Sequence, residues 1–315
     1  MKFIEFTKRF GDEAACKEYF KEFRLKQGLK CSKCGANNFH WLEDYDRWQC
    51  RSCHKQKTLR GGTLLESSHL PYHYWIYAIY LMTNTKKGIS ALEMQRQLGH
   101  KRYDPIWYMM HKIRRAMGNR DDKYQLDKIV EFDDAFVKAS SDDKEDDTYG
   151  KRRGRGTLGK APIVLMASTA PGDPLVAQKS NKKPSRLRFI KMKVVEGQKS
   201  EDFEEKVEKH VKSNAELRTD GFKAYSKLKK YVQKHLAESI APEEAGIKLP
   251  WVHTTVSNLK RQLLGIHHNI KDIYLQNYLN EFCYKTNRRY YSEQLFDRVM
   301  VAAVEQAWYG AKKPT

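Results

Sequence analysis

The sequence predicts an α/β protein in which a mixed-sheet domain is preceded by a zinc ribbon and a helix-turn-helix. Three patterns predict this order along the 315 residues: two C-x2-C pairs, then a pair of helices, then strand-like alternation after Gly118. A chain of this length has room for two domains and a small module. We expect a helix and zinc ribbon at 1–60, a helix-turn-helix region at 61–120, and the mixed-sheet domain at 121–315.

The chain is strongly basic, with 59 Lys and Arg against 39 Asp and Glu and a formal charge of +20. A hydrophobic content of 40% excludes a disordered polycation. The charge favours a nucleic acid partner, although lysines that serve only solubility are the alternative. No long apolar run, basic amphipathic helix or signal-peptide core is present, so we expect a cytoplasmic protein without a membrane partner.

Four of the six cysteines have the spacing of a metal site, with fifteen residues between two C-x2-C pairs. They are Cys31, Cys34, Cys50 and Cys53. Disulfides are rare in the cytoplasm, and each pair can turn two thiolates toward one tetrahedral ion, so we predict structural Zn²⁺ in a ribbon at 29–60. A redox pair is the alternative, but it does not explain the duplication. Cys16 and Cys283 should be small buried residues.

Residues 87–117 predict two helices joined by a short turn. Ser90 and Glu93 form a capping box, and Gly99 ends the first helix. The Asp-Pro pair at 104–105 begins the second helix. Two helices with this spacing, the second of them basic, are typical of a helix-turn-helix that binds a major groove, although an ordinary helical hairpin is the alternative.

The second helix of this pair has apolar side chains at intervals of three and four residues, which predicts a single buried stripe. The stripe consists of Ile106, Met109, Met110, Ile113 and Met117. Three basic residues of the same helix are expected to lie largely off the stripe and to contact DNA. They are Lys112, Arg114 and Arg115.

Residues after Gly118 alternate between apolar and polar in short runs, which predicts a mixed sheet. The expected strands are Lys128–Lys138, Pro162–Ser168, Leu187–Val195 and Glu216–Asp220, with a charged helix at Ser200–Asn214. An acidic and then glycine-rich basic segment at 142–160 should be a mobile loop.

Two of the predicted strands carry aspartates that would be costly to bury without a compensating cation. Asp133 lies within the first strand and Asp220 at the end of the last. Both are candidate ligands of Mg²⁺, and two such ions about 4 Å apart could activate an attacking oxygen at phosphorus. The alternative for either aspartate alone is a strand-end or turn cap.

The segment from Trp251 to Arg289 mixes cations, imidazoles and aromatics, a composition suited to phosphates and unstacked bases. Two helices, at 257–264 and 271–289, are expected on either side of a turn that contains Gly265. Packing alone could explain the aromatics, but it explains the polar SNLKR stretch less well.

Five motifs in order give a resemblance that runs from about Phe10 to Arg289. They are the paired C-x2-C motifs, GISALEMQRQLG, VEFDDAFV, LRTDGFKAY and HTTVSNLKRQLLGIHHN with YLNEFCYKTNRR. The chain resembles the zinc-ribbon DDE-type insertion-sequence transposases of the ISXO-like group. The resemblance implies a ribonuclease-H-like catalytic domain, two Mg²⁺ ions, and DNA strand cleavage and transfer at terminal inverted repeats.

The resemblance also implies roles for residues. Asp133 and Asp220 match the first two catalytic aspartates, and Asn258 matches the third position in its Asn type, with Lys260 nearby for phosphate. An amide oxygen should hold a metal more weakly than a carboxylate, so two other residues are alternative third ligands. These are Glu281 and His253.

Further basic residues match the family's C-terminal helices. Glu281, Lys285 and Arg288 follow its Glu-Arg-Arg pattern with Lys in place of the first Arg, which keeps the charge but loses the planar fork. Expected DNA contacts in this region are Arg261, Arg288 and Arg289.

The partners implied are double-stranded DNA, both transposon ends and target, and a second copy of the chain in a homodimer or larger synaptic complex. The expected location is a bacterial-type cytoplasm, in association with the nucleoid. Two alternatives remain open: a catalytically inactive, transposase-derived DNA-binding regulator, and a metal-dependent nuclease without strand transfer.

Overall fold

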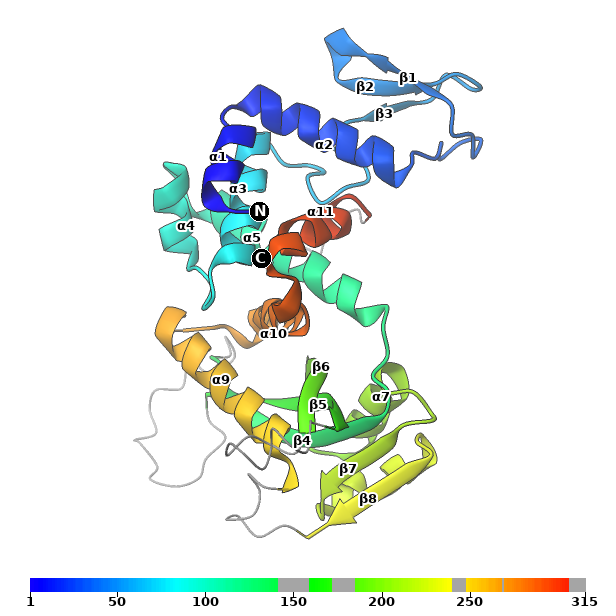
Figure 1. Ribbon diagram of the computed structural model, residues 1–315, viewed down its shortest axis with the longest axis vertical. Coiled ribbons are helices and arrows are strands. Elements are labelled where there is room, and N and C mark those ends of the chain that lie inside the picture. The colour runs from blue at the N-terminus through cyan, green and yellow to red at the C-terminus, as the bar shows by residue number, and fades with distance from the viewer. Residues whose placement is uncertain (141–158, 172–184, 240–247, 268, 306–315) are drawn as a thin grey trace. The chain divides into compact units, whose positions relative to one another are not determined.

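The computed structural model describes residues 1–140, 159–171, 185–239, 248–267 and 269–305 (Figure 1). They form two compact units, Met1–Asn119 with Tyr290–Thr315, and Arg120–Arg289. The second unit ends at Arg289, so the final helix belongs to the first unit. None of the helices in the described ranges combines the length and apolar character needed to cross a membrane.

The first unit begins with two helices and a small antiparallel sheet in the order β1-β2-β3. Its elements are α1 (Phe3–Arg9), α2 (Glu13–Gln27), β1 (Phe39–Leu42), the 3-10 turn η1 (Glu43–Tyr45), β2 (Arg47–Cys50) and β3 (Gln56–Thr58). Asp12 caps α2, since its carboxylate accepts a hydrogen bond from the Ala15 amide at 2.7 Å. Arg24 of α2 joins the helix to the chain after β3, because its guanidinium donates to the carbonyls of Thr58 (3.1 Å) and Gly61 (2.9 Å).

Within the described residues, the first unit contains four further α-helices. They are α3 (Tyr72–Asn84), α4 (Ala91–Leu98), α5 (Tyr103–Asp122, whose last three residues belong to the second unit) and α11 (Leu295–Glu305). The predicted ends of α4 are confirmed: the Ser90 hydroxyl accepts from the Glu93 amide at 3.1 Å, and Gly99 ends the helix with φ 64°. Helix α5 begins at Tyr103, one residue before the predicted cap. Its predicted apolar stripe is confirmed, because all five side chains are at most 1% exposed.

The second unit is built on a five-stranded mixed sheet, as predicted, in the order β6-β5-β4-β7-β8. The strands are β4 (Ile129–Lys138), β5 (Lys160–Pro171), β6 (Ser185–Val194), β7 (Glu216–Asp220) and β8 (Lys234–Glu238). β4, β5 and β6 pair antiparallel, whereas β7 and β8 run parallel to β4. The loop predicted at 142–160 lies outside the described residues except at its end, where Lys160 opens β5. The sequence did not predict β8.

Helices cover both faces of this sheet (Figure 1). They are α7 (Ser200–His210), η2 (Lys223–Lys230), α9 (Pro250–Ile266) and α10 (Asp272–Asn287). The 3-10 segment η3 (Arg289–Gln294) follows α10 and belongs to the first unit from Tyr290 onward. Alternation along β4 divides the core: Ala135 and Val137 pack with α9 and α10, whereas Val130 and Phe132 pack with α7 and η2. Odd-numbered side chains of β4 therefore face α9.

A buried histidine makes the stability of the second unit depend on pH. His210 is 2% exposed, and burial with the nearby charges of Lys193 and Lys191 lowers its pKa from 6.5 to about 3. Between these values only the unfolded chain takes up the proton, so stability falls as the pH falls below 6.5. We expect a loss of about 1–2 kcal/mol between pH 7 and pH 5. Urea unfolding should show that His210→Gln removes this loss, and an equal loss in variant and wild type would contradict the assignment.

Candidate functional site

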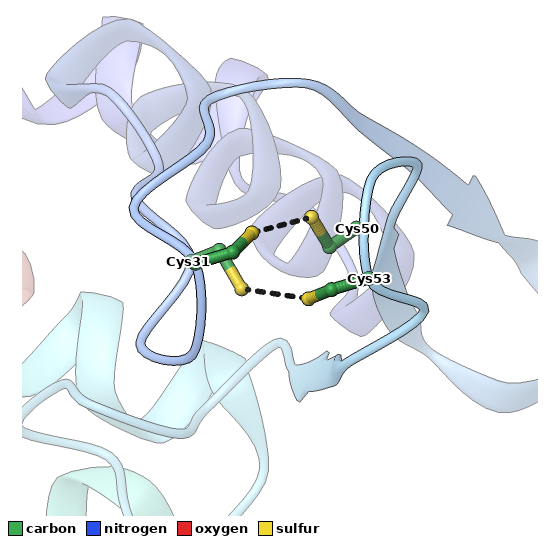
Figure 2. A group of neighbouring side chains, drawn as sticks. Cys31, Cys50 and Cys53 are labelled. Atoms are coloured by element: carbon green, nitrogen blue, oxygen red, sulfur yellow. Dashed lines mark hydrogen bonds between the residues drawn. The ribbon is translucent and has the colours of Figure 1, made fainter.

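The four predicted metal cysteines lie together, and Figure 2 labels three of them, Cys31, Cys50 and Cys53. Their sulfur atoms all lie within 4.8 Å of one another, with Cys31 and Cys53 at 3.5 Å and Cys34 and Cys50 at 3.6 Å. Sulfurs on a tetrahedral zinc ion are about 3.8 Å apart, whereas a disulfide would need about 2.05 Å. The thiols therefore fit a Zn²⁺ site and not a pair of disulfides.

Backbone amides in the first knuckle favour the thiolate form of Cys31. The amides of Cys34 and Lys33 face the Cys31 sulfur and lower the pKa of that thiol to about 6. Gly35, in the first knuckle, has φ 73°, which a residue with a side chain rarely adopts. The other two cysteines are buried, as predicted: burial raises the pKa of Cys16 and of Cys283 to about 12, which keeps both as inert thiols.

Asp133 and Asp220 lie on neighbouring strands of the larger sheet. The parallel pairing of β4 with β7 aligns Glu131 with Arg218, and each aspartate lies two residues further along its strand. Side chains two residues apart share a face, so both aspartates lie on the face covered by α9, each two residues beyond the last paired position of its strand. The sheet thus brings together the two acids that the sequence singled out.

The charges of neighbouring carboxylates change the pKa of Asp133. Burial and the charges of Asp134 and Asp220 raise the pKa of Asp133 from 3.8 to about 7. The raised pKa shows that ionising Asp133 is unfavourable, and a bound cation would stabilise the ionised carboxylates. Carboxylate oxygens are also the donors that Mg²⁺ prefers. The pair fits a divalent hard ion on both counts.

The neighbouring Asp134 lies on the opposite face and is held by its own partners. Its carboxylate accepts hydrogen bonds from the buried Tyr225 hydroxyl and from the Gln198 amide, the latter at 2.6 Å. The Asp134 amide also donates to the Asp133 carboxylate at 2.9 Å. These contacts fix the backbone of β4 next to Asp133, a role that sequence reasoning did not assign to Asp134.

Asn258, the predicted third position, is an exposed residue of α9. Its amide oxygen accepts a hydrogen bond from the Arg261 guanidinium at 2.6 Å. A metal ligand at this position would use the same oxygen, so the Arg261 contact would have to be released first. Lys260, the predicted phosphate contact, is exposed on the same helix.

The two alternative third ligands do not join the aspartates. Within the described residues, the four cysteines form the one group of three or more His, Cys, Asp or Glu side chains close enough to share an ion. Glu281 is instead buried in α10, with its carboxylate 4.0 Å from the Lys285 ammonium. His253 is half-buried in the first turn of α9.

Helix α5 presents less basic surface than predicted. Arg114 is only 1% exposed, so the prediction that it lies off the buried stripe is wrong. The physical reason is that α5 is covered on more than one side, with His111 and Ala116 buried as well. Lys112 is half-buried, and its ammonium donates to the Glu66 carbonyl at 2.9 Å, whereas Arg115 is partly exposed.

Two of the predicted DNA contacts at the end of α10 make structural contacts within the second unit. Arg289 donates to the carbonyls of Thr286 (2.8 Å) and Leu187. Arg288 forms an ion pair with Asp121 at 2.6 Å, with both side chains about one-tenth exposed. Asn287 also donates to Asp121, at 3.0 Å. The end of α10 is thereby tied to the last turn of α5.

Replacing Arg288 by alanine should therefore act on stability. The change leaves the Asp121 carboxylate buried without its cation, and breaking such a pair costs about 3–5 kcal/mol. Urea unfolding of Arg288→Ala should show a loss of this order. Arg218→Ala, which removes an exposed ion pair with Glu216 in the same unit, should cost less than about 1 kcal/mol. Equal losses in the two variants would count against the buried ion pair.

Sequence reasoning also missed the role of Glu131. This residue is 4% exposed, and its carboxylate accepts hydrogen bonds from the amides of Trp251 (2.8 Å) and Val252 (3.1 Å) in the first turn of α9. The signal in the sequence is an acidic residue in an apolar strand, two positions before Asp133 on the same face.

Two family models match separate parts of the chain. Residues 125–287 match the model of the ISXO2-like transposase domain, and residues 11–56 match that of the transposase zinc-ribbon domain. The chain is also 22% identical, over 231 residues, to an uncharacterized protein in transposable element ISH50 of Halobacterium salinarum, a match covering 70% of this chain and 71% of that protein. Because the first match spans more than half of the sequence, the chain belongs to the family of ISXO2-like transposase domains and carries a transposase zinc ribbon.

Proposed function

We propose that this protein binds the terminal inverted repeats of an insertion sequence and catalyses metal-dependent cleavage and strand transfer of DNA. The observation that carries the proposal is the pair of aspartates, Asp133 and Asp220, which lie on the same face of adjacent parallel strands and interact electrostatically. The mixed sheet, with three antiparallel strands and two parallel ones, supports a ribonuclease-H-like domain. Membership of a transposase family supports DNA as the substrate.

In this proposal Asp133 and Asp220 hold two Mg²⁺ ions, and Asn258 completes the site through its amide oxygen. Bound Mg²⁺ would lower the pKa of the attacking water or 3′-hydroxyl and stabilise the leaving oxygen. Asp134, held by Tyr225, keeps the strand in place around Asp133. Lys260 supplies an exposed cation for a phosphate next to the scissile bond.

DNA ends would be bound by the ribbon and the helix pair α4 and α5. Residues 1–118 contain 22 Lys and Arg against 11 Asp and Glu, so this region carries about half of the net charge. Arg115 and the exposed lysines of the ribbon are candidates for these contacts, together with Arg261 of α9 in the second unit. Joining two ends requires at least two copies of the chain, and we infer a homodimer or larger complex on DNA in the nucleoid.

The deciding experiment is incubation of the protein with DNA that carries the flanking genomic repeats, a target plasmid and Mg²⁺, followed by sequencing of the products. Cleavage at the repeat ends with joined target DNA supports the proposal. Cleaved ends without joined products would show a nuclease instead.

The contact between Asn258 and Arg261 favours a second candidate function. With its oxygen engaged at 2.6 Å, Asn258 is a weaker third ligand than a free carboxylate, which suits a DNA-binding regulator that has lost catalysis. Specific binding of the repeats without any Mg²⁺- or Mn²⁺-dependent cleavage would establish this second function.

A further inference from the structure

The first turn of α9 lacks a cap of its own. The residue before the helix, Leu249, has no side chain that can accept a hydrogen bond, and Pro250 at the first position has no amide hydrogen. The next two amides, of Trp251 and Val252, would remain unsatisfied in a helix that begins here. His253 is the first residue whose amide reaches a carbonyl of the helix, that of Leu249, at 3.4 Å.

Glu131 of β4 takes the place of the missing cap. One oxygen of its buried carboxylate accepts hydrogen bonds from the amides of both Trp251 and Val252. Because Pro250 has no amide hydrogen and the His253 amide donates to Leu249, each amide hydrogen of the first turn has an acceptor. The carboxylate also lies at the positive end of the helix dipole, where a negative charge is stabilised. The Trp251 indole adds a second tie, because it donates to the Ser185 hydroxyl of β6 at 2.9 Å.

This cap fixes the position of α9 along the length of β4, in addition to holding the helix against the sheet. The strand and the helix run in the same direction (Figure 1). Glu131, near the start of β4, contacts the start of α9. Ser140, which follows β4, donates to the Ile270 carbonyl and accepts from the Asp272 amide, and both of these residues follow α9. From the Glu131 anchor, Asp133 lies about 6.7 Å along the strand. Asn258 lies about 9 Å along the helix axis from Val252. The contact between Glu131 and α9 therefore fixes where Asp133 and Asn258 lie relative to each other along the strand and the helix.

We propose that Glu131 is a positioning residue that holds Asn258 in register with Asp133 by capping α9. The inference rests on the proposed function, in which both residues serve one metal site. Glu131 acts through α9: its carboxylate is occupied by two backbone amides and does not bind the metal. Loss of the cap should leave DNA binding intact and slow the chemical step.

The test uses the full-length protein in a preformed complex with repeat-ended DNA, with cleavage started by adding Mg²⁺. Glu131→Ala should lower the maximal cleavage rate, or raise the Mg²⁺ concentration for half-maximal rate, by about 10–100-fold, the range typical of residues that orient metal ligands. Glu131→Gln keeps the length and one acceptor oxygen and should recover much of the rate. Glu131→Asp, one methylene shorter, should not.

A matched control separates positioning from general stability. Glu204→Ala removes a partly buried carboxylate that accepts from the Tyr231 hydroxyl at 3.0 Å on the opposite face of the sheet, so it should cleave at the wild-type rate. Amide hydrogen exchange should show lost protection at Trp251 and Val252 in Glu131→Ala and not in the control.

Three outcomes are informative. A Glu131→Ala protein that cleaves like the Glu204→Ala control overturns the inference. Slow cleavage with unchanged protection of the Trp251 and Val252 amides also overturns it, because Glu131 would then act directly at the metal. If the wild-type protein binds repeats but cleaves nothing, the proposed function fails, and the exchange measurement alone decides whether Glu131 anchors α9.

Discussion

Asp220→Ala is expected to reduce cleavage of repeat-ended DNA by at least about a thousandfold in Mg²⁺. In the proposed function the change removes one of the two carboxylates that hold the metal, and losing a single preorganised group that stabilises the transition state already costs about 10²–10³-fold. The measurement is a single-turnover cleavage assay at saturating protein. Because Asp220 lies at the end of its strand and not in a packed core, the variant should fold.

Binding and cleavage should separate in this variant. In the proposed function the first unit and exposed cations bind the DNA ends, so the footprint of Asp220→Ala should match that of the wild type. The control Glu216→Ala lies at the other end of β7, where the carboxylate pairs with Arg218 and Lys234, and it should cleave normally. An Asp220→Ala protein that still cuts the repeat ends in Mg²⁺ would remove the basis of the catalytic assignment.

Much of the fold could be predicted from local pattern. The strands of the second unit follow from alternation in runs such as IVEFDDAFV, and the ends of α4 follow from Ser90 and Gly99, whose caps are formed by neighbouring residues. The ribbon follows from cysteine spacing. Each of these signals is contained within about thirty residues, so no knowledge of tertiary contacts is needed.

The missed features depend on contacts between distant residues. Arg114 looks like a surface cation on its helix, and only the packing around α5 shows that it is buried. Glu131 and Trp251 are 120 residues apart, so no local pattern could pair them. The strand β8, KHLAE, is polar because it lies at the edge of the sheet with half-buried or exposed side chains. This strand therefore lacks the apolar alternation from which the other four strands were predicted.

The two candidate catalytic aspartates could be predicted from the sequence because acidic residues are unusual in apolar strands. An aspartate in an apolar strand is costly wherever the strand pairs, so Asp133 and Asp220 are conspicuous from the residue pattern alone. The third position is different, because Asn258 lies on an exposed helix face where a polar residue costs nothing. Its assignment comes from the family resemblance, and the sequence itself offers no physical signal for it.

Removing zinc is expected to unfold the ribbon and abolish specific binding of the repeats. Its sheet has strands of four, four and three residues, too few to be stable alone, whereas a structural zinc ion contributes about 10–16 kcal/mol. Chelation or Cys50→Ser should reduce bound zinc from one ion per chain to none and erase the footprint at the repeats. Metal analysis and footprinting of the same samples provide the measurement.

The rest of the protein should survive this treatment. Helices α3 and α5 have their own buried core, with Trp75, Ile79 and Met110 at most 1% exposed, and the second unit is compact by itself. Weak, salt-sensitive binding to any DNA should therefore persist, because it depends on charge alone. Cys16→Ala removes a buried thiol of α2 and should keep both zinc and footprint. An unchanged footprint after complete zinc removal would show that the ribbon plays no part in recognising the ends.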